Sequence, residues 1–335
     1  MTHPRHPIVL QPTPLERLDR LSDHLDVEFY LKRDDLAGPS FGGNKARQLE
    51  YYFGAALAQQ SDTVLITGAV QSNFVRMTAA IANTLGMRTI VQLEDRVDTQ
   101  SDVYATSGNV LLNKVLGAEI ITYPEGEDEA GADRALEQRA DELRREGRRP
   151  YVIPLGETHP PIGALGYVKA AKEILAQKED LDVFIVASGG GATHSGLLAG
   201  LKGAGFSGRV IGSCVRRDAV QQDARIRRII RRLTTLDDGA AKVSDDDVRV
   251  WDGALAPGYG HIGAPALDAI KLMAGQAGLI LDPVYTAKVF AAVPALIEDG
   301  TIPLGSKVCM IHTGGLAGVF AYQDVLANLL SDPPR

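Results

Sequence analysis

Residues 41–50 read Phe41-Gly42-Gly43-Asn44-Lys45-Ala46-Arg47-Gln48-Leu49-Glu50, with one lysine directly behind two glycines and an asparagine. The glycines let the backbone bend closely around a flat ligand, and Asn44 can cap a helix that follows. That helix is expected because apolar residues recur at helical spacing, namely Leu49, Tyr52, Phe53 and Leu57. A partly desolvated lysine at its start is a candidate nucleophile that can form a Schiff base. The alternative is a solvated surface lysine.

Short, continuous apolar runs alternate with helical patterns along the chain, as is typical of parallel strands covered on both faces. The expected strands are Thr63–Thr67, Thr89–Leu93, Ala118–Tyr123, Tyr151–Pro154, Val183–Ala187, Arg209–Cys214, Leu279–Leu281 and Val308–Ile311. The segment Glu125–Arg149 carries charges of both signs and is expected to be a solvated surface helix. The sequence therefore predicts a doubly wound α/β fold.

The composition is that of an ordinary globular protein, with 335 residues of which 45% are hydrophobic and 23% charged. No apolar run approaches the roughly 20 residues that span a bilayer, and Met1–His6 lacks the apolar core of a signal peptide, so we expect a cytoplasmic protein. The net charge of −7 argues against nucleic acid or a membrane as the main partner. Cys214 and Cys309 lie in apolar runs and are expected to be buried thiols, with no metal site.

A second motif, Gly68–Arg76, follows a predicted strand and opens a predicted helix. Backbone N–H groups in the first turn of a helix favour an anion, so the loop at Gln71, Ser72 and Asn73 can hold a carboxylate. The alternative is that Ser72 or Asn73 only caps the helix. The residues alone leave both interpretations open.

A third motif lies at 187–196, again between a predicted strand and a predicted helix, and contains Gly189, Gly190 and Gly191. Consecutive glycines let the backbone N–H groups turn inward as a nest, and Ser188 and Thr193 add hydroxyl groups. Together they suit a phosphate group.

A dinucleotide site is the alternative for this motif, because Arg216-Arg217 at the end of the next strand could bind a 2′-phosphate. The glycine spacing fits the dinucleotide fingerprint imperfectly, since Ser195-Gly196 overshoots it. His194 is expected to pack or cap locally.

Two further motifs follow expected strands near the C-terminus. Asp282–Lys288 carries Tyr285, and Ile311–Gly315 carries Thr313. In α/β sheets ligands gather at the carboxyl ends of strands. Tyr285 alone could be a core aromatic, but a lysine, a nest, a hydroxyl and a phenol at strand ends together favour a cofactor site.

Five motifs, in this order, resemble those of the 1-aminocyclopropane-1-carboxylate deaminase and D-cysteine desulfhydrase family, from about Thr13 to Tyr322. They are Gly42–Lys45, Gln71–Asn73, Gly163–Tyr167, Asp282–Tyr285 and His312–Gly315. The resemblance implies a pyridoxal-phosphate enzyme with the tryptophan synthase β fold (fold type II), a small amino-acid substrate and a homodimer. We expect a large cofactor-binding domain, residues 1–46 and 156–335, and a small inserted domain, residues 47–155, each with an open, twisted, mostly parallel sheet.

The resemblance also implies roles for the matching residues. Lys45 would be the Schiff-base lysine and would move protons at the substrate's Cα and Cβ, with Asn44 beside it at the cofactor. Asn73 would hydrogen-bond the cofactor's 3′-oxygen, next to a substrate carboxylate site at Gln71 and Ser72.

The remaining roles fall on the later motifs. The implied phosphate loop is Ser188, Gly189, Gly190, Gly191, Ala192 and Thr193. Thr313 would lie near the pyridine nitrogen, while Tyr259 and Tyr285 would face the substrate.

One position separates the two activities of the family. In the cyclopropane deaminases a glutamate typically follows the second tyrosine and keeps the pyridine nitrogen protonated, whereas this chain has Thr286. Opening an unactivated cyclopropane needs more electron withdrawal than expelling a good leaving group. Thr286 therefore favours simple β-elimination of the D-cysteine desulfhydrase kind, which gives pyruvate, ammonia and sulfide, over deamination of the cyclopropane.

Two departures from the family pattern bear on the substrate. Phe74 replaces a polar residue after the Ser-Asn pair, and the loop 156–161 contains Thr158 and His159. These two side chains could bind a sulfonate, as an L-cysteate sulfo-lyase would require. The alternative is that the loop lies outside the substrate site.

Two hypotheses come from other classes of protein. An NADP-binding oxidoreductase would use the glycines and Arg216-Arg217 but leave Lys45 unexplained. A catalytically silent cofactor-binding protein would leave Ser72 and Tyr285 without a use.

Overall fold

The computed structural model describes residues 3–98, 101–156 and 159–331. The strands are β1 (Leu15–Arg17), β2 (Glu28–Lys32), β3 (Thr63–Ala69), β4 (Arg88–Glu94), β5 (Glu119–Tyr123), β6 (Pro150–Ile153), β7 (Val183–Ser188), β8 (Arg209–Cys214), β9 (Arg249–Trp251) and β10 (Lys307–Ile311). The α-helices are α1 (Asp19–Leu25), α2 (Lys45–Ala58), α3 (Asn73–Thr84), α4 (Asp102–Thr106), α5 (Gly108–Val115), α6 (Glu129–Arg145), α7 (Leu165–Gln177), α8 (Ala192–Gly203), α9 (Ala219–Leu233), α10 (Ala264–Ala277), α11 (Thr286–Glu298), α12 (Leu316–Ala321) and α13 (Gln323–Ser331).

The chain divides into two compact units, which are described separately. The first contains Pro7–Tyr51 and Pro160–Gly315, and the second contains His3–His6, Tyr52–His159 and Leu316–Arg335. The expected domain division stays a prediction, and it differs from these units mainly in grouping the C-terminal segment with the large domain.

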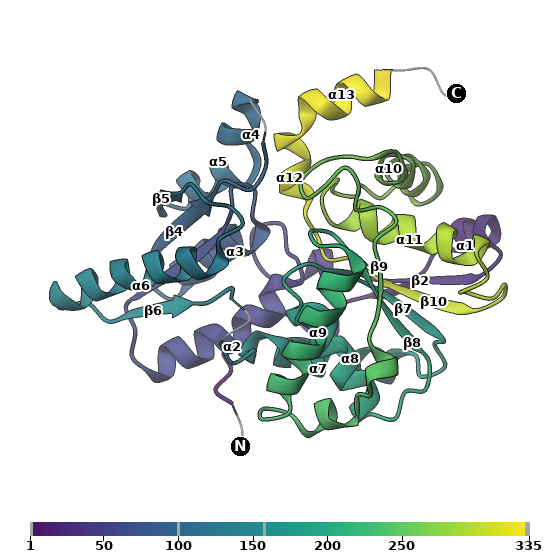
Figure 1. Cartoon of the computed structure of the whole chain (residues 1–335), viewed down its shortest axis with the longest axis horizontal. Helices are drawn as coiled ribbons and strands as arrows, with labels where there is room; N and C mark the ends of the chain where they lie inside the picture. The colour runs from purple at the N-terminus through teal and green to yellow at the C-terminus, as the bar shows by residue number, and fades with distance from the viewer. Residues whose placement is uncertain (1–2, 99–100, 157–158, 332–335) are drawn as a thin grey trace. The chain divides into compact units, whose positions relative to one another are not determined.

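The first unit is built on a six-stranded sheet in the order β1-β2-β10-β7-β8-β9 (Figure 1). β1 pairs antiparallel with β2, and the other neighbours are parallel. Every residue of β7 is buried, which fits a central strand with helices on both faces. On one side of the sheet the rings of Phe29 and Phe290 meet edge to face at 5.7 Å. The doubly wound α/β class is thus confirmed for this unit.

The second unit has a four-stranded parallel sheet in the order β5-β4-β3-β6 (Figure 1). Its helix α6 buries Leu136, Ala140 and Leu143 against Leu65 and Ile90 and leaves its charged residues outside. The prediction of a solvated surface helix in this segment is therefore confirmed.

One predicted strand is wrong. Leu279–Leu281 forms an extended link between α10 and α11, in which Ile280 is 49% exposed. The link pairs with no strand of the described chain, and the next amide, that of Asp282, bonds instead to the Thr286 hydroxyl at 2.7 Å. β1, β2 and β9 were not predicted.

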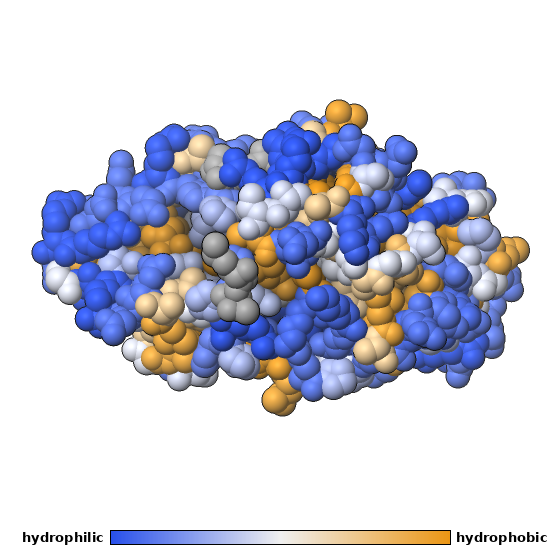
Figure 2. All heavy atoms as spheres, turned by 90° about the horizontal axis from the view of Figure 1, so that it is seen from below, coloured by the Kyte–Doolittle hydropathy of each residue, from blue (hydrophilic) through white to orange (hydrophobic). Residues whose placement is uncertain are grey.

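The surface mixes hydrophilic and apolar residues, and the apolar ones are scattered over the face in Figure 2. No helix within the described residues is long and apolar enough to cross a bilayer. Cys214 and Cys309 are buried free thiols, as predicted, and burial raises the pKa of each to about 12. The described residues contain no cluster of side chains suited to a metal ion.

Candidate active site

Lys45 is the first residue of α2, behind a backbone that only glycine can follow. Gly42 and Gly43 have φ values of +59° and +132°, and a Cβ on Gly42 would lie 2.0 Å from the carbonyl oxygen of Asp35. The lysine side chain is half-buried, and desolvation lowers the pKa of its amine to about 8. A larger fraction of this amine is therefore uncharged near neutral pH than for an ordinary lysine.

Asn44 ties the start of α2 to two other segments of the first unit. Its Nδ2 donates to Thr193 Oγ1 at 2.8 Å, and its backbone N–H donates to the carbonyl of Thr313 at 3.2 Å. Gly43 and Gly314 also lie close, since a Cβ on Gly314 would approach the Gly43 Cα to 3.0 Å. The lysine, the glycine-rich loop and the end of β10 are thus held together.

The loop between β7 and α8 forms the predicted nest. Gln222 and Arg225 of α9 donate to the carbonyls of Gly189 and Gly190 at 3.1 and 3.0 Å. In a trans peptide the C=O and the next N–H point in opposite directions. The N–H groups of Gly190 and Gly191 therefore point away from α9, next to the unpaired N–H groups that begin a helix. This donor set suits a phosphate dianion.

The hydroxyls of the loop have different surroundings. Thr193 Oγ1 accepts from Asn44 and from Gln48 Nε2, both at 2.8 Å, so its own proton is available to an anion. The buried Ser188 Oγ lies 2.8 Å from Gln222 Nε2 and 3.0 Å from His194 Nδ1, so it supports the loop from within.

One expectation for this loop is confirmed. His194 packs locally, and desolvation lowers the pKa of its imidazole to about 4. Arg217 Nη1 contacts the carbonyl of Gly189 at 3.4 Å, so it lies against the loop. The supporting side chains on α9 were missed, because nothing in an amphipathic helix marks which of its polar residues reach a neighbouring loop.

Gly191 offers a test of the nest. Its φ of +99° is unfavourable for other residues, and a Cβ there would lie 2.5 Å from Ile229 Cδ1. Gly191→Ala is expected to destabilise the apoprotein by about 1–3 kcal/mol and to weaken phosphate binding. Gly190→Ala is the matched control, because a Cβ at Gly190 meets no atom within 4 Å. Urea unfolding of the two apoproteins measures the difference, and equal stability would contradict a constrained nest.

Asp282 organises the turn that carries Tyr285. Its buried carboxylate accepts N–H groups of Val284, Tyr285 and Thr286 at 3.0, 2.9 and 2.8 Å, and Thr286 Oγ1 donates to it at 2.7 Å. Burial raises the pKa of Asp282, and these hydrogen bonds oppose the shift. A Cβ on Gly315 would lie 2.6 Å from the same carboxyl group. The turn is thereby joined to the segment after Thr313.

The two predicted tyrosines meet. Tyr259 Oη lies 2.6 Å from Tyr285 Oη, and their rings pack edge to face. Either hydroxyl can be the donor of this bond, so the two phenols are held as a hydrogen-bonded pair.

The predicted residues of the second unit form a separate group. Ser72 caps α3 by accepting from the Val75 N–H at 3.3 Å, and its binding of a carboxylate stays a prediction. Gln71 Nε2 donates to the carbonyls of Tyr104 and Ser107, so its side chain fixes the α4–α5 turn. Asn73 Oδ1 accepts from Asn109 Nδ2 at 3.0 Å, which leaves the Asn73 amide nitrogen as the donor for a ligand.

The two departures from the family pattern are also in the second unit. Phe74 is buried and its ring centre lies 6.2 Å from that of Tyr52, so it is a core residue of that unit. His159 Nε2 lies 3.4 Å from Asp133 Oδ2, which also accepts the Gly156 N–H at 3.2 Å. Thr158 lies outside the described residues.

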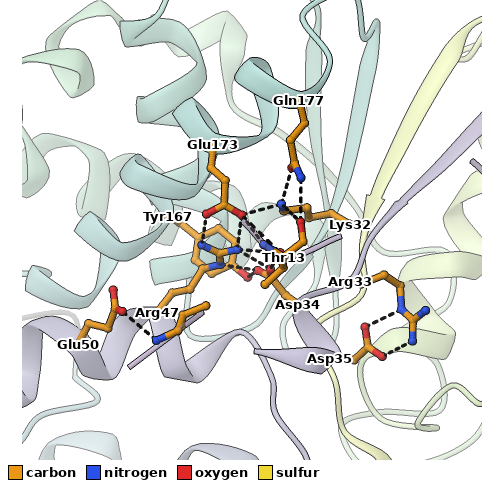
Figure 3. A network of polar contacts seen from close by, with 11 residues as sticks. Thr13, Lys32, Arg33, Asp34, Asp35, Arg47, Glu50, Tyr167, Glu173 and Gln177 are labelled. Carbon is orange, nitrogen blue, oxygen red and sulfur yellow. Dashed lines mark hydrogen bonds and ion pairs between the residues drawn. The ribbon is translucent and has the colours of Figure 1, made fainter. Parts of the chain in front are cut away.

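A buried ion network surrounds Arg47 of α2 (Figure 3). Arg47, two residues along α2, makes paired bonds to Asp34 at 2.7 and 2.8 Å and to Glu173 at 2.9 and 3.0 Å. Lys32 donates to Glu173 at 2.6 Å, and Tyr167 donates to Asp34. The two positive charges of this network balance its two negative charges. The ion pairs fix the first turn of α2 to β2 and α7.

The sequence and the fold match those of known proteins. The family model described as "Pyridoxal-phosphate dependent enzyme" matches residues 8–314, so the chain belongs to this family. Among curated relatives, a 1-aminocyclopropane-1-carboxylate deaminase of Mesorhizobium japonicum is 38% identical over 97% of this chain and 98% of its own. A D-cysteine desulfhydrase of Salmonella typhi is 38% identical over 95% and 96%.

A solved structure titled as an ACC deaminase homologue superposes with a TM-score of 0.86 at 35% identity, covering 98% of this chain and 97% of the other. O-ureido-L-serine synthase, at 17% identity and a TM-score of 0.68, shares the fold. The predicted tryptophan synthase β-like fold, the pyridoxal-phosphate cofactor and the lyase class are thus confirmed. The NADP and catalytically silent alternatives were wrong.

Proposed function

We propose that this enzyme β-eliminates a small β-substituted amino acid, with D-cysteine as the first candidate. Elimination releases sulfide, and hydrolysis of the resulting enamine by water gives pyruvate and ammonia. The observation that carries the proposal is the hydrogen bond between the Thr286 hydroxyl and the Asp282 carboxylate. The Thr286 hydroxyl donates to the Asp282 carboxylate at 2.7 Å, at the position where the cyclopropane deaminases carry a glutamate. No carboxylate from this position can keep the pyridine nitrogen protonated.

The residues of the first unit fit the cofactor. The N–H groups at Gly190 and Gly191 and the Thr193 hydroxyl would hold its phosphate, with Ser188, Gly189 and Ala192 completing the loop. Lys45, whose pKa is lowered to about 8, would bind its aldehyde carbon. When bound, pyridoxal phosphate withdraws electrons from the substrate's α-carbon.

Lys45 and the two tyrosines suit an elimination. Lys45 would take the proton from the substrate's Cα, since an amine with a pKa near 8 is an effective base at neutral pH. One phenol of the Tyr259–Tyr285 pair would pass a proton to the departing sulfur. Ser72 and Asn73, in the second unit, are proposed to bind the substrate carboxylate and the cofactor's 3′-oxygen. Thr313 is proposed to lie near the pyridine nitrogen.

A substrate panel tests the proposal. Purified holoenzyme is given D-cysteine, L-cysteine, L-cysteate, D-serine, β-chloro-D-alanine and 1-aminocyclopropane-1-carboxylate, and the oxo acid, sulfide and sulfite are measured. We expect pyruvate and sulfide from D-cysteine, with kcat/KM at least about 100-fold above that for 2-oxobutyrate formation from the cyclopropane. Sulfite release from L-cysteate as the fastest reaction would favour the sulfo-lyase alternative, and equal turnover of the cyclopropane would sink the Thr286 argument.

A homodimer and a cytoplasmic location are also proposed, on the family resemblance and the sequence composition respectively.

A further inference from the structure

Lys288 is a buried cation in an unfavourable place. It is the third residue of α11 and its side chain is fully buried. The first turn of a helix carries the positive end of the helix dipole, which disfavours a lysine. Burial lowers the pKa of the amine to about 8, although the charge of Asp282 opposes the shift. A lysine at such a position costs stability unless its donors are well used.

Its donors hold the turn that carries Tyr259. Lys288 Nζ donates to the carbonyl of Gly258 at 2.7 Å and to that of Leu255 at 3.1 Å. The same two carbonyls accept backbone N–H groups within the turn, that of Leu255 from Gly258 at 2.9 Å and that of Gly258 from His261 at 3.3 Å. The ammonium group therefore binds the carbonyls at both ends of the segment Leu255–Gly258, which directly precedes Tyr259.

We propose that Lys288 is a positioning residue that places the Tyr259 phenol against Tyr285. The inference rests on the proposed function, which has this phenol pair donate a proton to the leaving group. Asp282, which precedes α11, accepts the backbone N–H of Tyr285, and Lys288, in the first turn of α11, donates to the turn that carries Tyr259. The two phenol oxygens, 2.6 Å apart, are thus held by a single segment, Asp282–Lys288.

The test is a double-mutant cycle with Lys288→Met and Tyr259→Phe. Methionine has nearly the length of lysine and no donor, and both carbonyls keep their backbone partners, so the variant is expected to fold. We expect Lys288→Met to lower kcat about 10- to 100-fold while KM changes less than about threefold. In the Tyr259→Phe background the same change should cost less than about twofold, because the phenol that it positions is gone. Lys271→Met, an exposed lysine on α10, is the matched control.

Amide hydrogen exchange of the apoprotein gives a readout without catalysis. Exchange in residues 252–263 should quicken in Lys288→Met and stay as in the wild type in Lys271→Met. In Lys288→Arg, which keeps a cation, the slow exchange should be partly restored. The arginine variant also serves as the test if the methionine variant is poorly folded. If the kcat losses multiply in the double mutant, or if the turn exchanges as in the wild type, the proposal is overturned. Failure of D-cysteine as substrate does not affect this result, since the cycle uses whichever substrate of the panel turns over.

Discussion

Lys45→Ala is expected to abolish the visible absorbance of the bound cofactor and to lower kcat/KM by at least about 10³-fold. The side chain has a half-buried amine with a pKa of about 8 at a helix start that follows two glycines with positive φ. Alanine removes the nucleophile for the cofactor and the base for the substrate's Cα in one step, while α2 keeps a strong helix former. Absorbance before and after borohydride, together with pyruvate release, measures both losses.

The control is Lys172→Ala, an exposed lysine on α7, which should keep the absorbance and the activity. The lowered pKa also predicts a pH dependence. The uncharged amine is the reactive form, so cofactor incorporation into the apoprotein should quicken as the pH rises to about 8 and then level off. A borohydride-sensitive band that survives in Lys45→Ala would show that another lysine binds the cofactor.

The sequence predicted the loops at the ends of β7 and β10 well, because glycine runs after buried apolar strands restrict what the chain can do there. It also predicted that His194 packs locally. It did not reveal that Asn44 reaches Thr193, a contact between residues 149 positions apart. Such contacts depend on the packing of α2 against the loop, and no local pattern contains them.

Other failures have a similar cause. β2 was missed because its charged residue Lys32 looks solvated, whereas Glu173 and Gln177 of α7 satisfy it inside the fold. Leu279–Leu281 was taken for a strand on hydrophobicity alone, although it pairs with no strand in the described part of the chain. The side chain of Gln71 bonds to the backbone of a turn more than 30 positions away, a contact that the sequence did not reveal, and its role at the substrate stays a prediction. For Lys32 and Gln71 the partner is distant in sequence.

Arg47→Met is expected to lower the free energy of unfolding by about 3–5 kcal/mol, the largest stability effect that the structure predicts. Arg47 and Asp34 are fully buried, and Glu173 nearly so. Removing the arginine leaves two buried carboxylates with Lys32 as the remaining cation of the network. Urea unfolding of the apoprotein at pH 7 measures the loss. Arg17→Met, which breaks an exposed pair with Asp19, should cost less than about 1 kcal/mol.

Two further measurements separate charge from lost packing. Burial alone would raise the pKa of Glu173, but hydrogen bonds from Arg47 and Lys32 hold it at about 2. A carboxyl with a lowered folded pKa contributes stability above its ordinary pKa of about 4.5 and loses it as the pH falls toward 2. The deficit of Arg47→Met should therefore shrink between pH 4.5 and 2. Adding Asp34→Asn should recover part of the deficit at pH 7, because one unpaired charge is removed. A deficit that is constant with pH and additive with Asp34→Asn would assign the loss to packing instead.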